Sequence, residues 1–88
     1  MPKTFNLNIT APDKAIFDGK VASLIVPSAL GYLGVLADHT PLMANLVSGK
    51  IVFRDDAGKT QTLHSVGEGI IEVLKNNVSV LLHQSQLF

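Results

Sequence analysis

Serine, histidine and aspartate are all present in this chain of 88 residues, so nucleophilic catalysis is the first chemistry to consider. A catalytic serine needs a base within reach and often stands at a sharp Gly-x-Ser-x-Gly turn. No serine stands in that pattern, and Ser65 falls in an alternating stretch where we expect a polar surface residue. Because nothing brings a serine, a histidine and an aspartate together, we predict that the chain is not an enzyme.

Histidine is also a common metal ligand, and the chain contains His39, His64 and His83. Their spacings match no zinc pattern, because such sites use closely spaced pairs of ligands. Gly31-x-x-Gly34 is a short glycine motif, but a phosphate-binding loop would continue into Lys-Ser/Thr and a helix. We therefore expect no metal and no cofactor.

The composition narrows the class of function further. Seven basic and seven acidic side chains balance without forming a run, whereas a nucleic-acid-binding protein normally shows a basic patch. Without cysteine, neither disulfides nor thiolate metal sites can form. No wholly apolar run is longer than four residues, as in residues 24–27, which is too short to span a bilayer, and we expect no signal peptide. A protein-binding module remains.

Alternation of apolar and polar residues predicts an all-β fold. Residues 3–10 alternate cleanly, as a strand with one buried face does. Further strands are predicted over residues 15–17, 21–26, 33–37, 50–54, 60–65, 70–74 and 78–82. About eight to ten short strands with turn signals every 8–12 residues are typical of a small antiparallel β-sandwich or flattened barrel. We expect one such domain over residues 1–88.

Three local patterns qualify this strand map. Asp18-Gly19 is a hairpin signal, which would end one strand and begin another. Thr40-Pro41 resembles a helix start, but residues 42–47 are too few for a stable helix, so we interpret them as extended or irregular. The glycine pair in residues 66–69 predicts a bulge.

Several predicted strands carry large aliphatic side chains on both faces, notably residues 21–26, 70–74 and 78–82. A sandwich this small has a single interior, so apolar side chains on its outer faces would have to meet a partner. The alternative is that the sheets curl until both faces are covered, as in a small barrel. We favour a partner because so short a chain encloses little interior.

The segment most suited to a partner is Gly31-Tyr-Leu-Gly-Val-Leu-Ala-Asp-His-Thr-Pro41. Glycine inside a strand pattern marks a bulge or the close approach of another backbone. Pro41 fixes its own φ and restricts Thr40, so residues 38–41 should form a rigid, exposed corner.

This segment resembles the signature of the N-terminal β-sandwich domain of the ε subunit of rotary F-type ATP synthases, usually Gly-acid-Leu-Gly-Ile/Val and then Pro-Gly-His-Ala/Thr-Pro-Leu. Residues 4–9, 16–21, 65–73 and 77–81 resemble other strands of the same domain, in the same order. Each motif is weak alone, but together they cover essentially the whole chain and are specific.

The chain departs from the family pattern at three places. Tyr32 stands where many members carry an acid, and Ala37-Asp38 replaces the usual Pro-Gly. Most members continue into a C-terminal helical hairpin, whereas this chain ends at Phe88 and resembles a short form. Since the hairpin is the inhibitory element in relatives, we expect no inhibition of ATP hydrolysis and no nucleotide binding.

The resemblance implies a non-catalytic central-stalk subunit, part of the rotor, that couples proton translocation to ATP synthesis. It implies a peripheral position at the cytoplasmic face of the inner (plasma) membrane, without lipid insertion or nucleic-acid binding. The implied partners are the γ subunit and the c-ring, with the α/β hexamer as an indirect partner. The expected γ interface is His39, Thr40, Pro41, Leu42 and Ala44, and the expected c-ring loop is Leu30, Gly31 and Tyr32. The alternative is a β-sandwich adaptor that binds proteins but has no rotary role.

Overall fold

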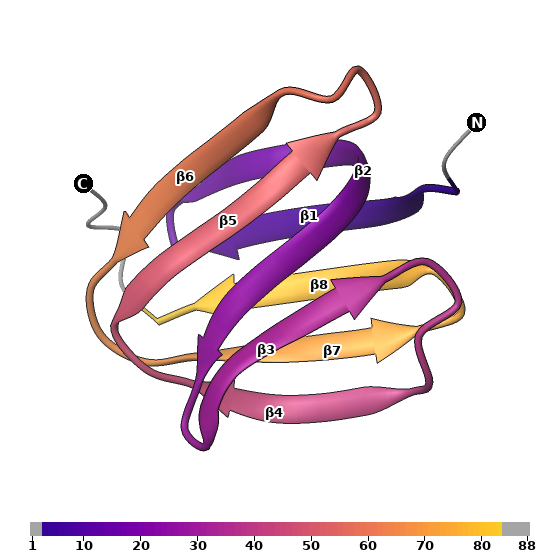
Figure 1. Cartoon of the computed structure of the whole chain (residues 1–88). Helices are drawn as coiled ribbons and strands as arrows, with labels where there is room; N and C mark the ends of the chain where they lie inside the picture. Colours follow the sequence, from indigo (N-terminus) through magenta and orange to yellow (C-terminus); the bar gives the residue numbers. More distant parts are fainter. Residues whose placement is uncertain (1–2, 84–88) are drawn as a thin grey trace.

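The computed structural model describes residues 3–83 and is built from strands alone (Figure 1). The strands are β1 (Phe5–Ala11), β2 (Lys14–Ser28), β3 (Gly31–Leu36), β4 (Leu42–Leu46), β5 (Gly49–Asp55), β6 (Thr60–Ser65), β7 (Gly69–Leu74) and β8 (Asn77–Leu82). The all-β class is therefore confirmed, and residues 42–46 are extended rather than helical. Within residues 3–83, no helix is long and apolar enough to cross a membrane.

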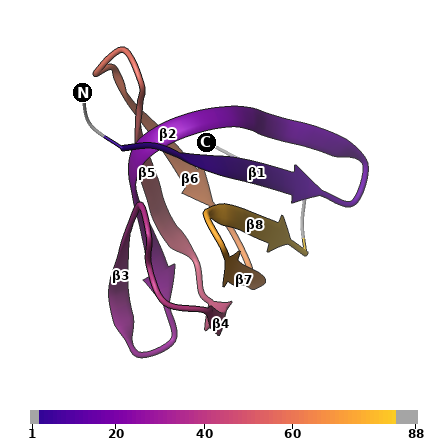
Figure 2. The ribbon, with the colours of Figure 1, turned by 90° about the vertical axis from the view of Figure 1, so that its right-hand side faces the viewer.

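The strands form two layers that share β2. The second half of β2 pairs with β3 on one side and with β5 on the other, and β6 pairs with β5. The first half of β2 pairs with β1, and the sheet continues through β8 and β7 to β4. Figure 2 shows β2 bending over from one layer to the other. Since β2 also meets β4 at Ser28 and Leu46, the sandwich closes into a flattened barrel.

The 15 residues of β2 form one continuous strand, which corrects the predicted hairpin at Asp18-Gly19. These two residues pair with Asn8 and Leu7 of β1. A Cβ built on Gly19 would lie 3.1 Å from the ring of Phe17, so the glycine makes room for this ring. Glycine thus occurs within strands where a neighbouring group needs the space of a side chain, and not only in turns.

One pairing among the described strands is parallel. β1 and β8 run side by side in the same direction, with Leu7 beside Val78 and Ile9 beside Val80. All other pairings are antiparallel, as the predicted class requires. The alternation of apolar and polar residues shows which face of a strand is buried, but not which strand lies beside it or in which direction. The parallel pairing of β1 with β8 could therefore not be predicted from the sequence pattern.

The core consists of the inward-facing apolar side chains of both layers. Its buried members are Phe5, Leu7, Ile9, Val21, Leu24, Val26, Val35, Leu46, Ile51, Phe53, Ile71, Val73, Val78, Val80 and Leu82. Ser65 is also buried, which corrects its predicted place on the surface. Its hydroxyl donates a hydrogen bond to the Gly49 carbonyl at 3.3 Å, so the polar atom is satisfied inside the protein.

The second glycine pair forms the link between β6 and β7 rather than a bulge inside a strand. Gly67 has a φ of 92°, and its N–H donates to the hydroxyl of Ser48 at 2.7 Å. A Cβ built on Gly69 would lie 2.6 Å from the carbonyl oxygen of Leu81, so only glycine fits there. Another backbone thus approaches closely at Gly69, whereas Gly31 and Gly34, for which the sequence suggested a bulge or such an approach, have no atom within 4 Å of a built Cβ.

Candidate interaction surfaces

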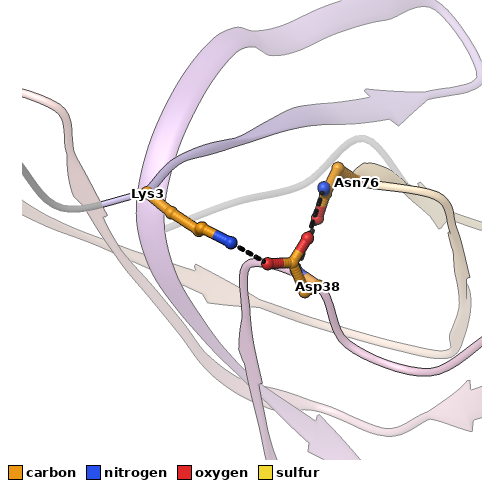
Figure 3. A network of polar contacts seen from close by, with 3 residues as sticks. All are labelled: Lys3, Asp38 and Asn76. Carbon is orange, nitrogen blue, oxygen red and sulfur yellow. Dashed lines mark hydrogen bonds and ion pairs between the residues drawn. The ribbon is translucent and has the colours of Figure 1, made fainter.

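The corner between β3 and β4 is held by a polar network centred on Asp38 (Figure 3). The Asp38 carboxylate accepts hydrogen bonds from Lys3 Nζ at 2.7 Å and from Asn76 Nδ2 at 3.0 Å. The Asp38 N–H donates to Asn76 Oδ1 at 2.6 Å. Lys3 precedes β1, and Asn76 belongs to the turn between β7 and β8. The network therefore joins the corner to two other parts of the sandwich.

The backbone at this corner has an uncommon conformation. Asp38 has a φ of 64°, in the left-handed region that glycine prefers and that aspartate tolerates. Asp38 thus adopts a conformation that glycine would take without steric cost. The adjacent β7–β8 turn uses the same region at Lys75 (φ 50°) and Asn76 (φ 61°), as tight hairpin turns with two such residues do. Two turns that both need positive φ are therefore hydrogen-bonded to each other.

The ion pair in this network favours the charged form of both partners. Hydrogen bonding and the charge of Lys3, with help from Asn76, hold the pKa of Asp38 below its usual value of 3.8. Asp38 in turn raises the pKa of Lys3 above 10.5. The side chains of Lys3 and Asp38 are 78% and 55% exposed, so water and salt weaken their attraction.

The residues expected at a γ interface divide into two groups. Thr40 and Pro41 are exposed at the corner, and the half-buried His39 beside them has its Nδ1 2.7 Å from the Thr40 carbonyl oxygen. Leu42 and Ala44 instead face inward on β4 and pack, partly buried, against the core. The structure thus brings the first three together on the surface and places the other two beneath it.

Sequence reasoning missed Met43, which is 67% exposed on the outer side of β4. Met43 lies opposite Glu72 of β7, and Ile70 on the same face lies opposite Leu81 of β8. With Leu74, which is 51% exposed, the apolar residues of this side form what we call the Met43 face, defined by Met43, Ile70, Leu74 and Leu81, and the exposed Glu72 lies among them. The alternation in residues 42–46 would have identified Met43 once the inward position of Leu42 was known.

The residues expected at a c-ring loop also separate. The β2–β3 hairpin turns at Ala29 and Leu30, and the Leu30 side chain is fully exposed (100%). Gly31 has a φ of 122° and its carbonyl accepts a hydrogen bond from the Ser28 hydroxyl, which fixes the tip. Leu30 and Gly31 therefore form the end of the sandwich.

Tyr32 points away from this tip. A Cβ built on Gly49 would lie 2.9 Å from Pro27 Cβ and 3.4 Å from the Tyr32 hydroxyl. Since Tyr32 pairs with Pro27, its ring crosses the outer side of β2 towards β5. Its phenol thus belongs to the broad face of the β3–β2–β5–β6 layer.

A hollow of about 410 Å³ connects the two expected sites. It is lined by Ser28, Ala29, Leu30, Leu42, Met43, Ala44 and Asn45. The tip of the β2–β3 hairpin and the strand β4 therefore share one surface. Among residues 3–83, no three histidine, aspartate or glutamate side chains are grouped so that they could hold a metal ion.

Comparison with known proteins places this fold among ATP synthase components. Residues 4–86 match the family described as ATP synthase, Delta/Epsilon chain, beta-sandwich domain. The chain is 38% identical to an ATP synthase epsilon chain of Synechocystis sp. over 96% of its own length, and 38% identical to one of Leptospira borgpetersenii over 93%. It is 33% identical to one of Dichelobacter nodosus over 97%. The chain spans 60%, 63% and 59% of the lengths of these three relatives.

Two solved assemblies contain chains of similar fold. A chain in the cryo-EM structure of the Euglena gracilis mitochondrial ATP synthase, OSCP/F1/c-ring in rotational state 1, superimposes with a TM-score of 0.86 at 22% identity. The superposition covers the whole of the 88-residue chain and 54% of the Euglena chain. A chain of the Tetrahymena thermophila central stalk/c-ring structure gives 0.76 at 15% identity, over 99% of this chain and 67% of that one. At such identities the likeness concerns the fold alone.

Proposed function

The chain belongs to the family of the ATP synthase delta/epsilon chain β-sandwich domain, and from this membership we propose that it is a non-catalytic central-stalk subunit of a rotary ATP synthase. The match over residues 4–86 is the observation that carries the proposal. In this role the chain binds the γ subunit, contacts the c-ring and couples proton translocation to ATP synthesis. Its place is peripheral, on the cytoplasmic side of the energy-coupling membrane.

The γ subunit binds at the corner of His39, Thr40 and Pro41 and on the adjoining Met43 face. Two features support this assignment. Exposed apolar side chains gather there on β4, β7 and β8, and such patches favour protein contacts. The Asp38 network fixes the corner, so little conformational freedom is lost on binding. Leu42 and Ala44 support this surface from inside rather than forming most of the contact.

The c-ring contacts the tip formed by Leu30 and Gly31. The tip is the far end of a tight hairpin, and a fully exposed leucine there offers an apolar contact without a charge. Tyr32 contributes little to this contact, because its ring points away from the tip towards β5. The hollow beside the tip extends to Met43, so γ and the c-ring would meet on neighbouring surfaces.

The test is purification of the assembled synthase through a tag on this chain. We expect γ and c subunits to co-purify, and depletion of the chain to reduce proton-driven ATP synthesis in membrane vesicles. Wild-type chain should restore synthesis and Met43→Lys should restore it poorly. Ala15→Lys, which also changes an exposed strand position, is the control and should restore it fully. Purification without γ and c, together with unchanged synthesis after depletion, would favour the adaptor without a rotary role.

A further inference from the structure

We propose that the outer side of the β3–β2–β5–β6 layer is a further docking surface, for a protein segment in which carboxylates stand beside aliphatic side chains. We call it the Ile25 face and define it by Ile25, Tyr32, Gly34, Leu36, Lys50 and Arg54. Figure 2 shows β3 on one side of the molecule and β7 and β8, which carry most of the Met43 face, on the other. The proposal does not depend on a rotary role.

The centre of this face is apolar and exposed. Ile25 is 44%, Tyr32 66% and Leu36 64% exposed. Ile25 of β2 lies opposite Gly34 of β3 and opposite Val52 of β5, so the apolar side chains adjoin one another across three strands. The layers have closed into a flattened barrel, yet these side chains stay in water, so the closure does not account for them.

Gly34 leaves a gap in the middle of the apolar centre. A Cβ built on Gly34 would meet no atom within 4 Å, so no neighbour in the chain occupies the space. Tyr32 and Leu36 flank it along β3, and Ile25 faces it across the strand pair. Gly34 therefore leaves a shallow depression between larger side chains on the exposed face, with room for one side chain of a partner, and we call this depression the socket.

The charge of the face is positive although the chain is neutral overall. Lys50 and Arg54 stand on the outer side of β5, and their cross-strand neighbours are His64, Thr60 and Ser23. Residues 23–28, 31–36, 49–54 and 60–65 of the four strands contain no aspartate or glutamate, and Asp55, which ends β5, accepts hydrogen bonds from the N–H groups of Ala57 and Lys59 in the turn. A partner with carboxylates beside its apolar side chains would complement this pattern.

Two other occupants fit the face less well. A second copy of the chain would bring Lys50 and Arg54 towards their own counterparts, because a two-fold interface pairs one patch with itself. An anionic lipid surface would match the charge, but a fluid surface has no defined side chain for the gap at Gly34. The socket therefore favours a protein segment.

The test is selection of a random peptide library displayed on phage against the 88-residue chain. We expect the enriched peptides to carry aspartate or glutamate next to leucine, isoleucine or valine. Gly34→Val should weaken a selected peptide at least about tenfold, because it fills the socket. Since Gly34 has open space, the variant should have a thermal midpoint no lower than that of the wild type. Ser79→Val, on an exposed strand position of β8, is the matched control and should leave binding unchanged.

Charge variants and two further assays decide the chemistry of the partner. Arg54→Glu should weaken the selected peptides about three- to tenfold, since an exposed ion pair is replaced by repulsion. Selection that enriches no sequence, enrichment without acidic residues, or equal binding to Gly34→Val would overturn the proposal. Binding to phosphatidylglycerol vesicles that Arg54→Glu abolishes would assign the face to lipid instead. A dimer in sedimentation that Leu36→Ser disrupts would assign it to a second copy.

Discussion

Asp38 combines a left-handed backbone with two side-chain hydrogen bonds, and substitutions can separate these two features. Asp38→Ala removes the side-chain bonds and keeps the cost of positive φ, whereas Asp38→Gly removes the bonds and relieves that cost. We therefore expect thermal midpoints to fall in the order wild type, Asp38→Gly, Asp38→Ala. Circular dichroism melting of the three proteins checks the order. Equal midpoints for the two variants would contradict the left-handed conformation.

The Lys3–Asp38 pair should make a pH-independent contribution to stability through the neutral range. The pKa of Asp38 is lowered, so its contribution is complete above 3.8 and is lost as the pH falls through the lower, folded-state value. The pKa of Lys3 is raised, so its contribution is complete below 10.5 and is lost as the pH rises through the higher, folded-state value.

The measurement compares the melting temperatures of the wild type and Lys3→Met at several pH values. The difference should stay constant between about pH 5 and pH 9 and disappear at both extremes. It should also shrink in 1 M salt, because both side chains are exposed. A difference that changes between pH 6 and pH 8 would point to a histidine and contradict this account.

Within the strands, two glycines with opposite surroundings provide a matched pair of tests. Gly34→Ala puts a methyl group into open space and should raise the free energy of unfolding by about 0.5–1 kcal/mol. Gly69→Ala puts a methyl group 2.6 Å from the Leu81 carbonyl oxygen and should lower it by about 1–3 kcal/mol. Urea unfolding of both variants gives the two signs. If both variants changed the free energy of unfolding in the same direction, either Gly34 would not be in open space or Gly69 would not lie against the Leu81 carbonyl.

Strand β4 offers a second test, because Leu42 and Met43 point to opposite sides. Leu42→Ala should lower the free energy of unfolding by about 1–2 kcal/mol, since Leu42 packs partly buried against the core. Met43→Ala should change it by less than about 0.5 kcal/mol, because Met43 is 67% exposed. On γ binding the order should reverse, with Met43→Ala weakening it about fivefold or more. A larger loss of γ binding for Leu42→Ala than for Met43→Ala would contradict the Met43 face.

Most strands could be predicted because each has one buried face. Phe5, Leu7 and Ile9 alternate in the sequence and are all buried in the structure. Asp18-Gly19 misled the prediction, because the pair has the chemistry of a turn and only the pairing with β1 makes it strand. Local preferences cannot report a long-range partner, so the continuity of β2 and the parallel β1–β8 pair lay beyond the sequence.

The candidate surfaces were predicted in part for a similar reason. Thr40-Pro41 marks a corner by its backbone chemistry alone, and the structure has an exposed corner there. In residues 42–47, however, apolar side chains occupy both parities, so the sequence did not tell which face was buried. The sequence pattern therefore favours Leu42 and Ala44 as interface residues, whereas the structure exposes Met43 more than either of them.

For the molecule within its proposed complex, the uncharged tip predicts weak salt dependence of c-ring binding. Leu30 is fully exposed and residues 28–34 carry no charged side chain, so apolar contact rather than an ion pair would hold the ring. Raising the salt from 50 to 300 mM should therefore change the dissociation constant by less than about threefold. Sedimentation of the chain with purified c-ring measures this. A steep loss of binding at higher salt would contradict this prediction and would indicate that charged residues near the tip form ion pairs with the ring.

The parallel pairing of β1 with β8 has a consequence for synthesis on the ribosome. β1 leaves the ribosome first and can pair with β2 at once, but the strand that covers its other edge, residues 77–82, is translated last. Until then the nascent chain presents an uncovered strand edge, which is a template for wrong pairing between chains. A chaperone bound to the emerging chain would therefore be most useful at β1, and translation that stops before residue 77 would leave Leu7 and Ile9 without neighbours on that side.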